Sequence, residues 1–291
     1  ILHVHYAIPH ASAAVNAKQI LATYGIDIPI VTTLHGTDIT LLGKDKSFKP
    51  VIEYAINQSD VVTAVSKNLK QETVSNFKID NDIKTIPNFI DMRLYKQECN
   101  QILRNKFAKK EEVILIHISN FRKVKRVHDV VKIFEKVRRQ FPSKLLLIGD
   151  GPERLKAEQL CRKLGVTKDV KFLGKLKVIE KMLSIADVFL LPSETESFGL
   201  VALEAMASKV AIISTNSGGL PEVNIEGKTG FMSDVGDVKK MAKDTLYLLT
   251  DTKKLDEFKD SALAHAKTFD LPNILPQYEA VYQELSCNMK K

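Results

Sequence analysis

The sequence lacks tryptophan, has three cysteines among 291 residues, and contains no internal repeat or low-complexity tract. Cys99, Cys161 and Cys287 lie far apart and form neither a CxxC pair nor another spacing typical of metal ligands. We therefore expect no disulfide framework and no metal site, and a reducing cytoplasm is the simplest compartment. No stretch reaches the about 18 uninterrupted apolar residues that a membrane span needs, so we expect no stable membrane insertion.

The composition is otherwise ordinary for a globular protein, with 44% hydrophobic and 27% charged residues. This balance excludes a disordered chain, and a prior of about 150 residues per domain suggests roughly two domains. The 43 basic and 35 acidic residues leave a net charge of +8, but in residues 1–90 eight lysines balance eight acids. The excess in residues 91–291 indicates either an anionic ligand or a basic solvated surface.

Short β-branched segments alternate with longer amphipathic segments along the chain. The segments that predict strands are 1–5, 28–33, 60–64, 83–86, 113–118, 144–148, 169–173, 187–191 and 210–213. The segments that predict helices are 10–23, 47–57, 66–76, 127–140, 153–164, 176–185, 199–207, 237–249 and 274–285. This alternation predicts an α/β fold whose parallel sheets are covered by helices on both faces.

The pattern breaks at two places. Pro87 and Asn88 open a polar stretch that places a domain boundary within residues 88–95, and a second break falls at residues 270–272. The helix expected after the second break either packs back on the first domain or is a plain C-terminal helix. The chain opens on the buried-strand sequence Ile-Leu-His-Val-His without a polar leader, so we expect its first domain to be incomplete.

Residues 32–38 are the first segment with candidate chemistry. They follow an expected strand, and His35 therefore stands where ligands bind in α/β proteins. Gly36 allows a sharp turn or a close approach to a ligand. A histidine hydrogen-bonded within a turn, beside a helix-capping Asp38, is the alternative.

Two further segments suit phosphate groups. Residues 122–126 hold four cations in five positions at an expected helix start, where free N–H groups add positive potential. These cations would repel the helix dipole, so local stability does not explain them, although a solvated basic face remains open. Residues 149–153 (Gly-Asp-Gly-Pro-Glu) predict a tight turn over which a nucleotide can lie.

Residues 192–204 form the most informative segment. We expect Ser197 to cap the helix that follows, so that the next backbone N–H groups point outward. Gly199 removes a side chain where a phosphate would approach. Glu204 interrupts an apolar helix and needs partners, either sugar hydroxyls or a lysine. Further on, the glycines of 217–222 and 227–230 are turn signals that leave room for a sugar.

The spacing of Glu196 and Glu204, with Gly-Gly-Leu-Pro-Glu at 218–222, resembles the retaining glycosyltransferases of family four. That family has the GT-B architecture, in which two Rossmann-like domains with parallel sheets face each other across a cleft. Residues 3–10, 32–40 and 116–126 are most similar to the branch that transfers N-acetylglucosamine from UDP-GlcNAc to L-malate in bacillithiol biosynthesis. The resemblance implies a retaining hexosyltransferase without a cofactor, because Lys125 and Arg122 can neutralise a diphosphate without Mg²⁺.

The resemblance also implies how the chain is divided. Residues 1–92 would form a partial N-terminal acceptor-binding domain, with the C-terminal helix 272–291 packing back on it. Residues 93–271 would form the nucleotide-sugar-binding domain. The early glycine-rich loop of the family is not found, so we expect residues 1–291 alone to bind donor but to show weak or no transfer.

The site residues follow from the same resemblance. The donor-binding residues that it implies are Ser119, Asn120, Arg122, Lys125, Gly149, Glu196, Ser197, Phe198, Gly199, Leu200, Val201 and Glu204. Glu196 would hold the hydroxyls of the donor sugar, Glu204 the ribose, and Lys125 the diphosphate. Asn120 stands near where many relatives carry an arginine.

The acceptor-binding residues implied are Tyr6, Thr33, His35, Ser66 and Lys67, and the catalytic residues are His35, Glu196, Lys125 and Arg122. Charge that grows on the leaving diphosphate would be stabilised by Lys125, Arg122 and backbone N–H groups. Glu196 is expected to bind hydroxyls and not to attack the sugar, so the two-carboxylate scheme of glycosidases does not apply.

Other readings remain open. The same enzyme class could use a lipid, a polysaccharide or an inositol phosphate as acceptor, and nucleotide-sugar epimerases share the GT-B shape. An epimerase would not explain the Glu196–Glu204 spacing, and a membrane-bound acceptor predicts a basic amphipathic helix that the neutral residues 1–90 do not supply. A nucleic-acid binder predicts aromatics interleaved with a basic stripe, which is not seen. The sequence leaves a homo-oligomer open.

Overall fold

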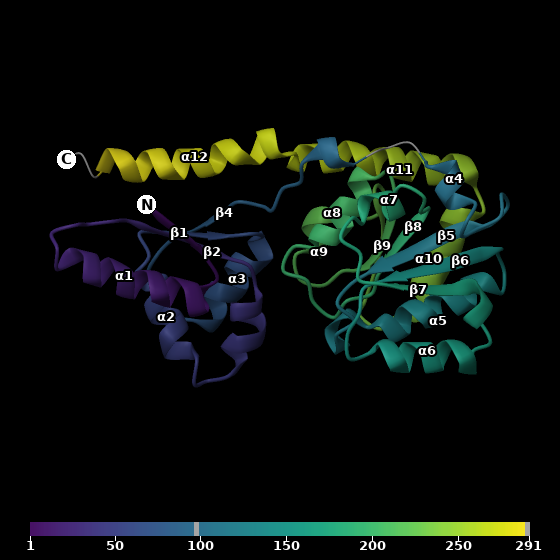
Figure 1. The fold of residues 1–291 in the computed structure, drawn as a ribbon, viewed down its shortest axis with the longest axis horizontal. Helices are drawn as coiled ribbons and strands as arrows, with labels where there is room; N and C mark the ends of the chain where they lie inside the picture. Colours follow the sequence, from purple (N-terminus) through teal and green to yellow (C-terminus); the bar gives the residue numbers. More distant parts are fainter. Residues whose placement is uncertain (96–98, 289–291) are drawn as a thin grey trace. The chain divides into compact units, whose positions relative to one another are not determined.

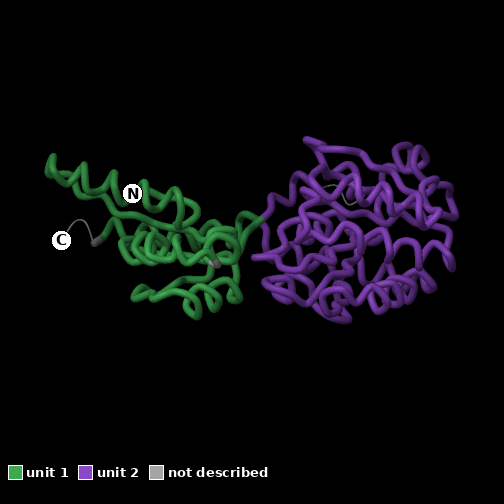
Figure 2. Tube along the Cα trace, turned by 90° about the horizontal axis from the view of Figure 1, so that it is seen from below, with its two compact units in different colours: residues 1–89, 271–291 green, residues 90–270 purple. Residues whose placement is uncertain are grey.

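The computed structural model of the protein describes residues 1–95 and 99–288, and both parts are built of alternating strands and helices (Figure 1). The chain divides into two compact units (Figure 2). Unit 1 comprises residues 1–89 and 271–291, and unit 2 comprises residues 90–270. The last helix of the chain therefore belongs to the same unit as the first strand.

Unit 1 contains a four-stranded parallel sheet in the order β1-β2-β3-β4. The strands are β1 (Leu2–His5), β2 (Ile30–Leu34), β3 (Val61–Ala64) and β4 (Ile83–Thr85). The helices are α1 (Ser12–Ala22), α2 (Lys49–Asn57), α3 (Lys67–Asn76) and α12 (Leu271–Asn288). Neighbouring residues of β2 point to opposite faces of the sheet. Ile30 packs against α1, whereas Val31 packs against α12, so helices cover both faces.

Unit 2 contains a six-stranded parallel sheet in the order β10-β9-β8-β5-β6-β7. The strands are β5 (Val113–Ile118), β6 (Ser143–Ile148), β7 (Val170–Gly174), β8 (Val188–Leu191), β9 (Ala211–Thr215) and β10 (Gly230–Ser233). The chain leaves β5 toward β6 and β7, then returns to build β8, β9 and β10 on the other side of β5. This doubly wound order is Rossmann-like, and its strand order reverses beside β5, where such folds bind ligands.

The helices of unit 2 cover both faces of this sheet (Figure 1). The helices are α4 (Gln101–Arg104), α5 (Val127–Arg138), α6 (Arg154–Lys163), α7 (Glu180–Leu183), α8 (Leu200–Ala207), α9 (Leu220–Val223), α10 (Val238–Leu249) and α11 (Thr252–Ala266). Single helical turns occur in both units at Ala7–Ala11, Thr37–Leu41, Leu42–Lys44, Met92–Leu94, Lys123–Lys125, Thr167–Asp169 and Lys267–Phe269. Among the described residues, no helix is long and apolar enough to cross a membrane.

The predicted α/β fold with parallel sheets is confirmed, and nine expected strands are present as β1 to β9. One predicted helix was too long, and four elements were missed: α4, α9, α11 and β10. The helix expected at 176–185 is confined to α7, because residues 175–179 form the loop after β7. Strand β10 was missed because it starts on a glycine and spans four residues. Helix α11 was missed because its buried face relies on Ala262 and Ala266, which give little apolar periodicity.

Candidate active site

Four loops of unit 2 meet at one edge of its sheet. They follow β5, β6, β8 and β9, at residues 119–126, 149–153, 192–199 and 216–219. These strands are parallel, and β6, β5, β8 and β9 are consecutive neighbours in the sheet. Their carboxyl ends therefore lie side by side, and four of the five segments singled out in the sequence come together there. The exception within them is residues 227–230, which precede β10 and lie at the opposite edge of the sheet, so they do not line this site.

Glycines allow the loops to approach each other closely. A Cβ atom on Gly149 would lie 1.7 Å from the carbonyl oxygen of Ser119, and one on Gly218 would lie 2.1 Å from that of Glu196. Any side chain at either position would displace the neighbouring loop. The glycines thus set the spacing of the backbone that carries Ser119 and Glu196.

Lys125 and Glu196 form an ion pair, with 2.6 Å between Nζ and Oε1. The pair is largely shielded, because the lysine side chain is 21% exposed and the glutamate 12%. The Ser193 hydroxyl donates to the same carboxylate oxygen at 2.8 Å, and the Glu194 N–H donates to the Val124 carbonyl at 2.8 Å. The structure therefore brings together two residues that the sequence separates by 71 positions.

The four cations of residues 122–126 have different environments. Arg126 adopts a left-handed φ of 48°, and its guanidinium pairs with the buried Asp129 and, at 3.1 Å, with Glu194. Arg126 thereby braces the loop after β5 against the loop after β8. Arg122 and Lys123 are exposed, as is Asn120. Of the other three cations, Lys125 and Arg122 are the two that the family resemblance predicts to meet a diphosphate.

His117 fixes the position of Ser119. It is fully buried on β5, and its Nδ1 donates to the Leu190 carbonyl at 2.8 Å. Its Nε2 then accepts from the Ser119 hydroxyl at 2.8 Å, and that hydroxyl oxygen accepts the Phe121 N–H at 3.2 Å. Burial lowers the pKa of His117 to about 4, so the ring stays neutral. Ser119, predicted to bind the donor, has its hydroxyl engaged inside the loop.

Helix α8 presents its N-terminus at this edge, but Ser197 is not its cap. The cap residue is Gly199, whose left-handed φ of 96° no other residue adopts readily. The first helical bond runs from the Ala202 N–H to the Gly199 carbonyl. The N–H groups of Leu200 and Val201 precede that bond, as a phosphate site at a helix start requires. Phe198 is buried beneath them.

Glu204 lies one turn into α8 and is shielded from water. Burial, helped by the nearby charge of Glu180, raises the pKa of Glu204 to about 7. The Tyr95 hydroxyl makes a long hydrogen bond of 3.4 Å to it. In the described part of the chain, no lysine forms a salt bridge with Glu204, in contrast to the alternative left open by the sequence. Tyr95 was missed because nothing in its local sequence marks it.

In unit 1, the ends of β1 and β2 bring Tyr6 and His35 together, with 5.0 Å between ring centroids. The buried Asp38 carboxylate accepts from the N–H of Ala7 at 2.6 Å and of Gly36 at 3.2 Å. Asp38 thereby ties the turn after β1 to the turn after β2. Burial raises the pKa of Asp38, although these N–H groups oppose the shift.

The other residues predicted for the acceptor differ in exposure. Thr33 is buried, and its hydroxyl is bonded to His3 at 2.8 Å and to Thr63 at 2.7 Å. Ser66 is also buried and caps α3 by accepting the Leu69 N–H at 3.0 Å. Lys67 is exposed at the first position of α3.

Sequence reasoning also overlooked the second histidine of β1. His5 Nδ1 lies 2.9 Å from His35 Nε2. The alternation of His3 and His5 on a strand was the available signal, because residues two apart share a face of the sheet.

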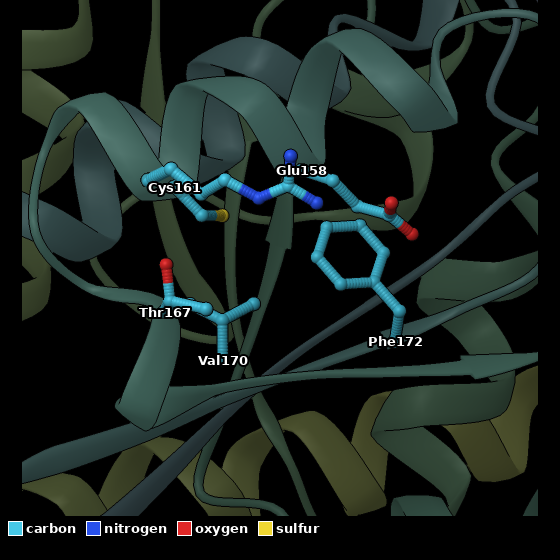
Figure 3. Close-up of a pocket in the computed structure, with 6 residues that line it drawn as sticks. Glu158, Cys161, Thr167, Val170 and Phe172 are labelled. Carbon is cyan, nitrogen blue, oxygen red and sulfur yellow. The ribbon is translucent and has the colours of Figure 1, made fainter.

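Two cavities of unit 2 lie away from these loops. One, of about 170 Å³, is enclosed by α6 and the segment after it, with Cys161 and Glu158 facing Thr167, Val170 and Phe172 (Figure 3). The other, of about 340 Å³, is lined by residues that include Arg104, Asp187 and Lys259. Neither is lined by a predicted site residue among the described residues.

Comparison with known proteins identifies relatives of both units. A family model described as "Glycosyl transferases group 1" matches residues 100–265, and one described as "Glycosyltransferase Family 4" matches residues 1–94. The chain is 48% identical to the N-acetyl-alpha-D-glucosaminyl L-malate synthase of Bacillus anthracis, over 98% of this chain and 74% of that protein. It is 38% identical to the D-inositol 3-phosphate glycosyltransferase of Corynebacterium urealyticum, over 47% of this chain and 33% of that protein.

Solved structures share the fold. The Anabaena protein Alr3699/HepE, crystallised with UDP and glucose, superposes with a TM-score of 0.84 at 23% identity, over 94% of this chain and 75% of that chain. Sucrose-phosphate synthase from Thermosynechococcus elongatus gives a TM-score of 0.83 at 20% identity, over 98% of this chain and 73% of that chain. At these identities the likeness concerns the fold alone.

Proposed function

The chain belongs to the glycosyltransferases of family four, and we propose that it transfers N-acetylglucosamine from UDP-N-acetylglucosamine to the hydroxyl of L-malate with retention of configuration. The observation that carries the acceptor is the 48% identity to a malate synthase over 98% of this chain. The observation that carries the donor site is the Lys125–Glu196 pair at the edge of the unit 2 sheet.

We propose that unit 2 binds the donor. The loops after β5 and β8 would hold the diphosphate between Lys125, Arg122 and the N-terminus of α8. Glu196 would accept hydrogen bonds from the hydroxyls of the sugar, and Glu204 from those of the ribose. The pairing of Lys125 with Glu196 supports this arrangement, because the lysine already binds an anionic group. A bound diphosphate would take the place of the Glu196 carboxylate as the partner of Lys125.

The proposed chemistry rests on charge that develops during bond breaking. Cleavage of the sugar–phosphate bond leaves the electron pair on the diphosphate oxygen, and the sugar carbon becomes oxocarbenium-like. Lys125, Arg122 and the N–H groups of Leu200 and Val201 would stabilise the leaving anion more strongly than the ground state. The acceptor hydroxyl would then attack from the face that the diphosphate leaves, and a phosphate oxygen would take its proton.

We propose that unit 1 binds the acceptor. Malate carries two carboxylates and a hydroxyl, so its site needs positive potential and hydrogen-bond donors. Lys67 and the N-terminus of α3 supply the first, and Tyr6 and His35 supply the second. Both proposed substrates are metabolites of the cytoplasm, so we place the activity there.

The test is transfer measured by mass spectrometry with UDP-N-acetylglucosamine and one candidate acceptor at a time. L-Malate should give a product heavier by one N-acetylglucosamine residue, and succinate, which lacks the hydroxyl, should give none. If the gene encodes residues before Ile1, the longer protein is assayed in parallel with residues 1–291. Product with inositol phosphate but not with malate would refute the proposed acceptor and retain the enzyme class.

A further inference from the structure

His5 presents an exposed imidazole to the predicted catalytic histidine, and the proposed function assigns it no role. It is the last residue of β1, and its Nδ1 lies 2.9 Å from Nε2 of His35 at the end of β2. The two ring centroids are 5.0 Å apart. This is hydrogen-bond distance for two ring nitrogens, of which one must donate and the other must accept.

We propose that His5 is a positioning residue for His35, holding its ring in one orientation and one tautomer. Because Nε2 of His35 is bonded to His5, the nitrogen left for a substrate is Nδ1. The inference rests on the proposed function and deepens it, because a histidine that donates a hydrogen bond to the acceptor must present a defined nitrogen to it. A ring that rotated freely would present either nitrogen, and misplaced groups lose much of their contribution to a reaction.

His5 is itself held in place. Its ring lies 4.8 Å from the ring of His3, centroid to centroid. His3 is anchored through Nδ1 to the Tyr282 hydroxyl at 2.6 Å and through Nε2 to Thr33 at 2.8 Å. The Nδ1 of His10 donates to the His5 backbone carbonyl at 2.6 Å. These contacts run from α12 to His5, so the group that orients His35 has an ordered support.

The charge state of the cluster suits a bond between two neutral rings. Burial, followed by the neighbouring His5 and His3, lowers the pKa of His35 to about 4. Burial and then His10 lower the pKa of His5, and burial and then His5 lower that of His3 to about 4. At neutral pH the pair therefore carries one proton on each ring, which is the state that permits one donor and one acceptor.

Among the described residues, no carboxylate forms a hydrogen bond or an ion pair with the rings of His3, His5 and His35, so no such contact favours the protonated form of a ring. The nearest carboxylate of the cluster, on Asp38, is turned to the backbone N–H groups of Ala7 and Gly36. Tyr6 contributes an aromatic ring, 5.0 Å from that of His35. Because His5 is exposed, its ring is not needed to fill the core, so its replacement should leave the fold intact.

The test compares three substitutions of His5. In His5→Asn the amide atoms lie at the same bond count from Cβ as Nδ1, so the hydrogen bond to His35 can be kept. In His5→Gln the amide lies one bond further out, as Nε2 does, and the bond is lost. His5→Leu removes the donor and acceptor altogether. His10→Asn is the control, because it removes a neighbouring exposed imidazole while its amide N–H can still donate to the His5 carbonyl as Nδ1 does.

The first readout is ¹⁵N nuclear magnetic resonance of histidine-labelled protein at neutral pH, which reports the tautomer of each ring without any substrate. We expect a single tautomer of His35 in the wild type, His5→Asn and His10→Asn, and a mixture of tautomers in His5→Leu and His5→Gln. An unchanged His35 spectrum in His5→Leu would overturn the proposal. This result does not depend on which acceptor the enzyme uses, so failure of the proposed function is seen separately.

The second readout is steady-state transfer. His5→Leu and His5→Gln should lower kcat by about 10- to 100-fold with little change in KM for the nucleotide-sugar. His5→Asn should recover most of the rate. Equal rates in His5→Asn and His5→Leu, whether both normal or both low, would contradict a positioning role.

Discussion

The Lys125–Glu196 pair carries most of the proposed donor chemistry at the scale of single residues. We expect Lys125→Ala to weaken UDP-sugar binding and also lower kcat by about 10²- to 10³-fold, because the lysine would meet charge that grows in the transition state. The control is Lys123→Ala, two residues away and exposed. Isothermal titration and steady-state kinetics measure the two effects, and equal behaviour of both variants would remove Lys125 from the site.

Glu196→Gln tests the other half of the pair. The amide keeps the shape of the side chain but cannot accept as strongly from sugar hydroxyls. Transfer should fall steeply, whereas the melting temperature should change little. A variant that simply unfolds would instead mean that the carboxylate serves to neutralise Lys125 in the fold.

We expect Glu204 to make donor binding depend on pH. Its pKa of about 7 lies above the ordinary value of 4.5, so the folded protein holds a proton that the unfolded chain releases between these values. Stability from this group is therefore lost as the pH rises through that window. If the ribose hydroxyls need the ionised carboxylate, binding of UDP-N-acetylglucosamine should strengthen from pH 6 to 8, on either side of about pH 7, and release a proton. Its diphosphate is esterified at both ends and has no group that titrates in this range.

Titration of UDP-N-acetylglucosamine in buffers of different ionisation enthalpy measures that proton release. In Glu204→Gln the affinity should be lower and nearly independent of pH over the same range. An unchanged pH dependence in this variant would show that another group is responsible.

At the residue scale, local sequence revealed the charged groups but not their partners. Spacing and the family resemblance singled out Glu196, Glu204 and Lys125. The role of Arg126 as a brace, and the contacts of Tyr95 and His5, depend on residues far away in the chain. No local pattern encodes such contacts, because they form only when the strands are side by side.

At the scale of elements, the loops are set by close backbone approach. Gly218 and Gly227 have nearly the same φ, 64° and 70°, but a Cβ on Gly218 would lie 2.1 Å from the Glu196 carbonyl whereas Gly227 has open space. Alanine at Gly227 should therefore cost only the left-handed strain of about 1–2 kcal/mol. Alanine at Gly218 should cost more and abolish transfer.

Denaturant unfolding of the two alanine variants separates the cost of the left-handed backbone from the cost of the steric clash with the Glu196 carbonyl. The difference in their free energies of unfolding is the cost of moving the loop that carries Glu196. If the two variants are equally stable and equally active, the close approach at Gly218 is not a constraint.

Elements with strong apolar periodicity were predicted well, and elements with weak apolar periodicity were missed. The strands β1 to β9 and the helices around them follow from β-branched runs and amphipathic spacing. The short β10 and the alanine-faced α11 lack those signals, and they are stabilised by the sheet and helices beside them. The cap of α8 was misplaced by two residues, because Ser197 is a favourable cap but Gly199 readily adopts the left-handed backbone found there.

At the scale of the whole molecule, the end of the chain completes the unit that the beginning starts. Ile274 of α12 is 4% exposed and packs with Val31 and Ile86, more than 180 positions away. Ile274→Ala should lower the free energy of unfolding by about 2–5 kcal/mol through a cavity, whereas Leu275→Ala, at a position 40% exposed, should cost much less. Equal melting temperatures of these two variants would contradict the packing of α12 on this sheet.

The central claim concerns what the whole enzyme does, and one competition experiment tests it most directly. The protein receives UDP-N-acetylglucosamine with equal concentrations of L-malate, succinate and inositol phosphate, and mass spectrometry identifies the product. The account predicts N-acetylglucosaminyl malate as the sole new species, formed by the wild type and nearly absent with Glu196→Gln. N-acetylglucosaminyl inositol phosphate as the product would contradict it. So would a malate product of undiminished yield from Glu196→Gln.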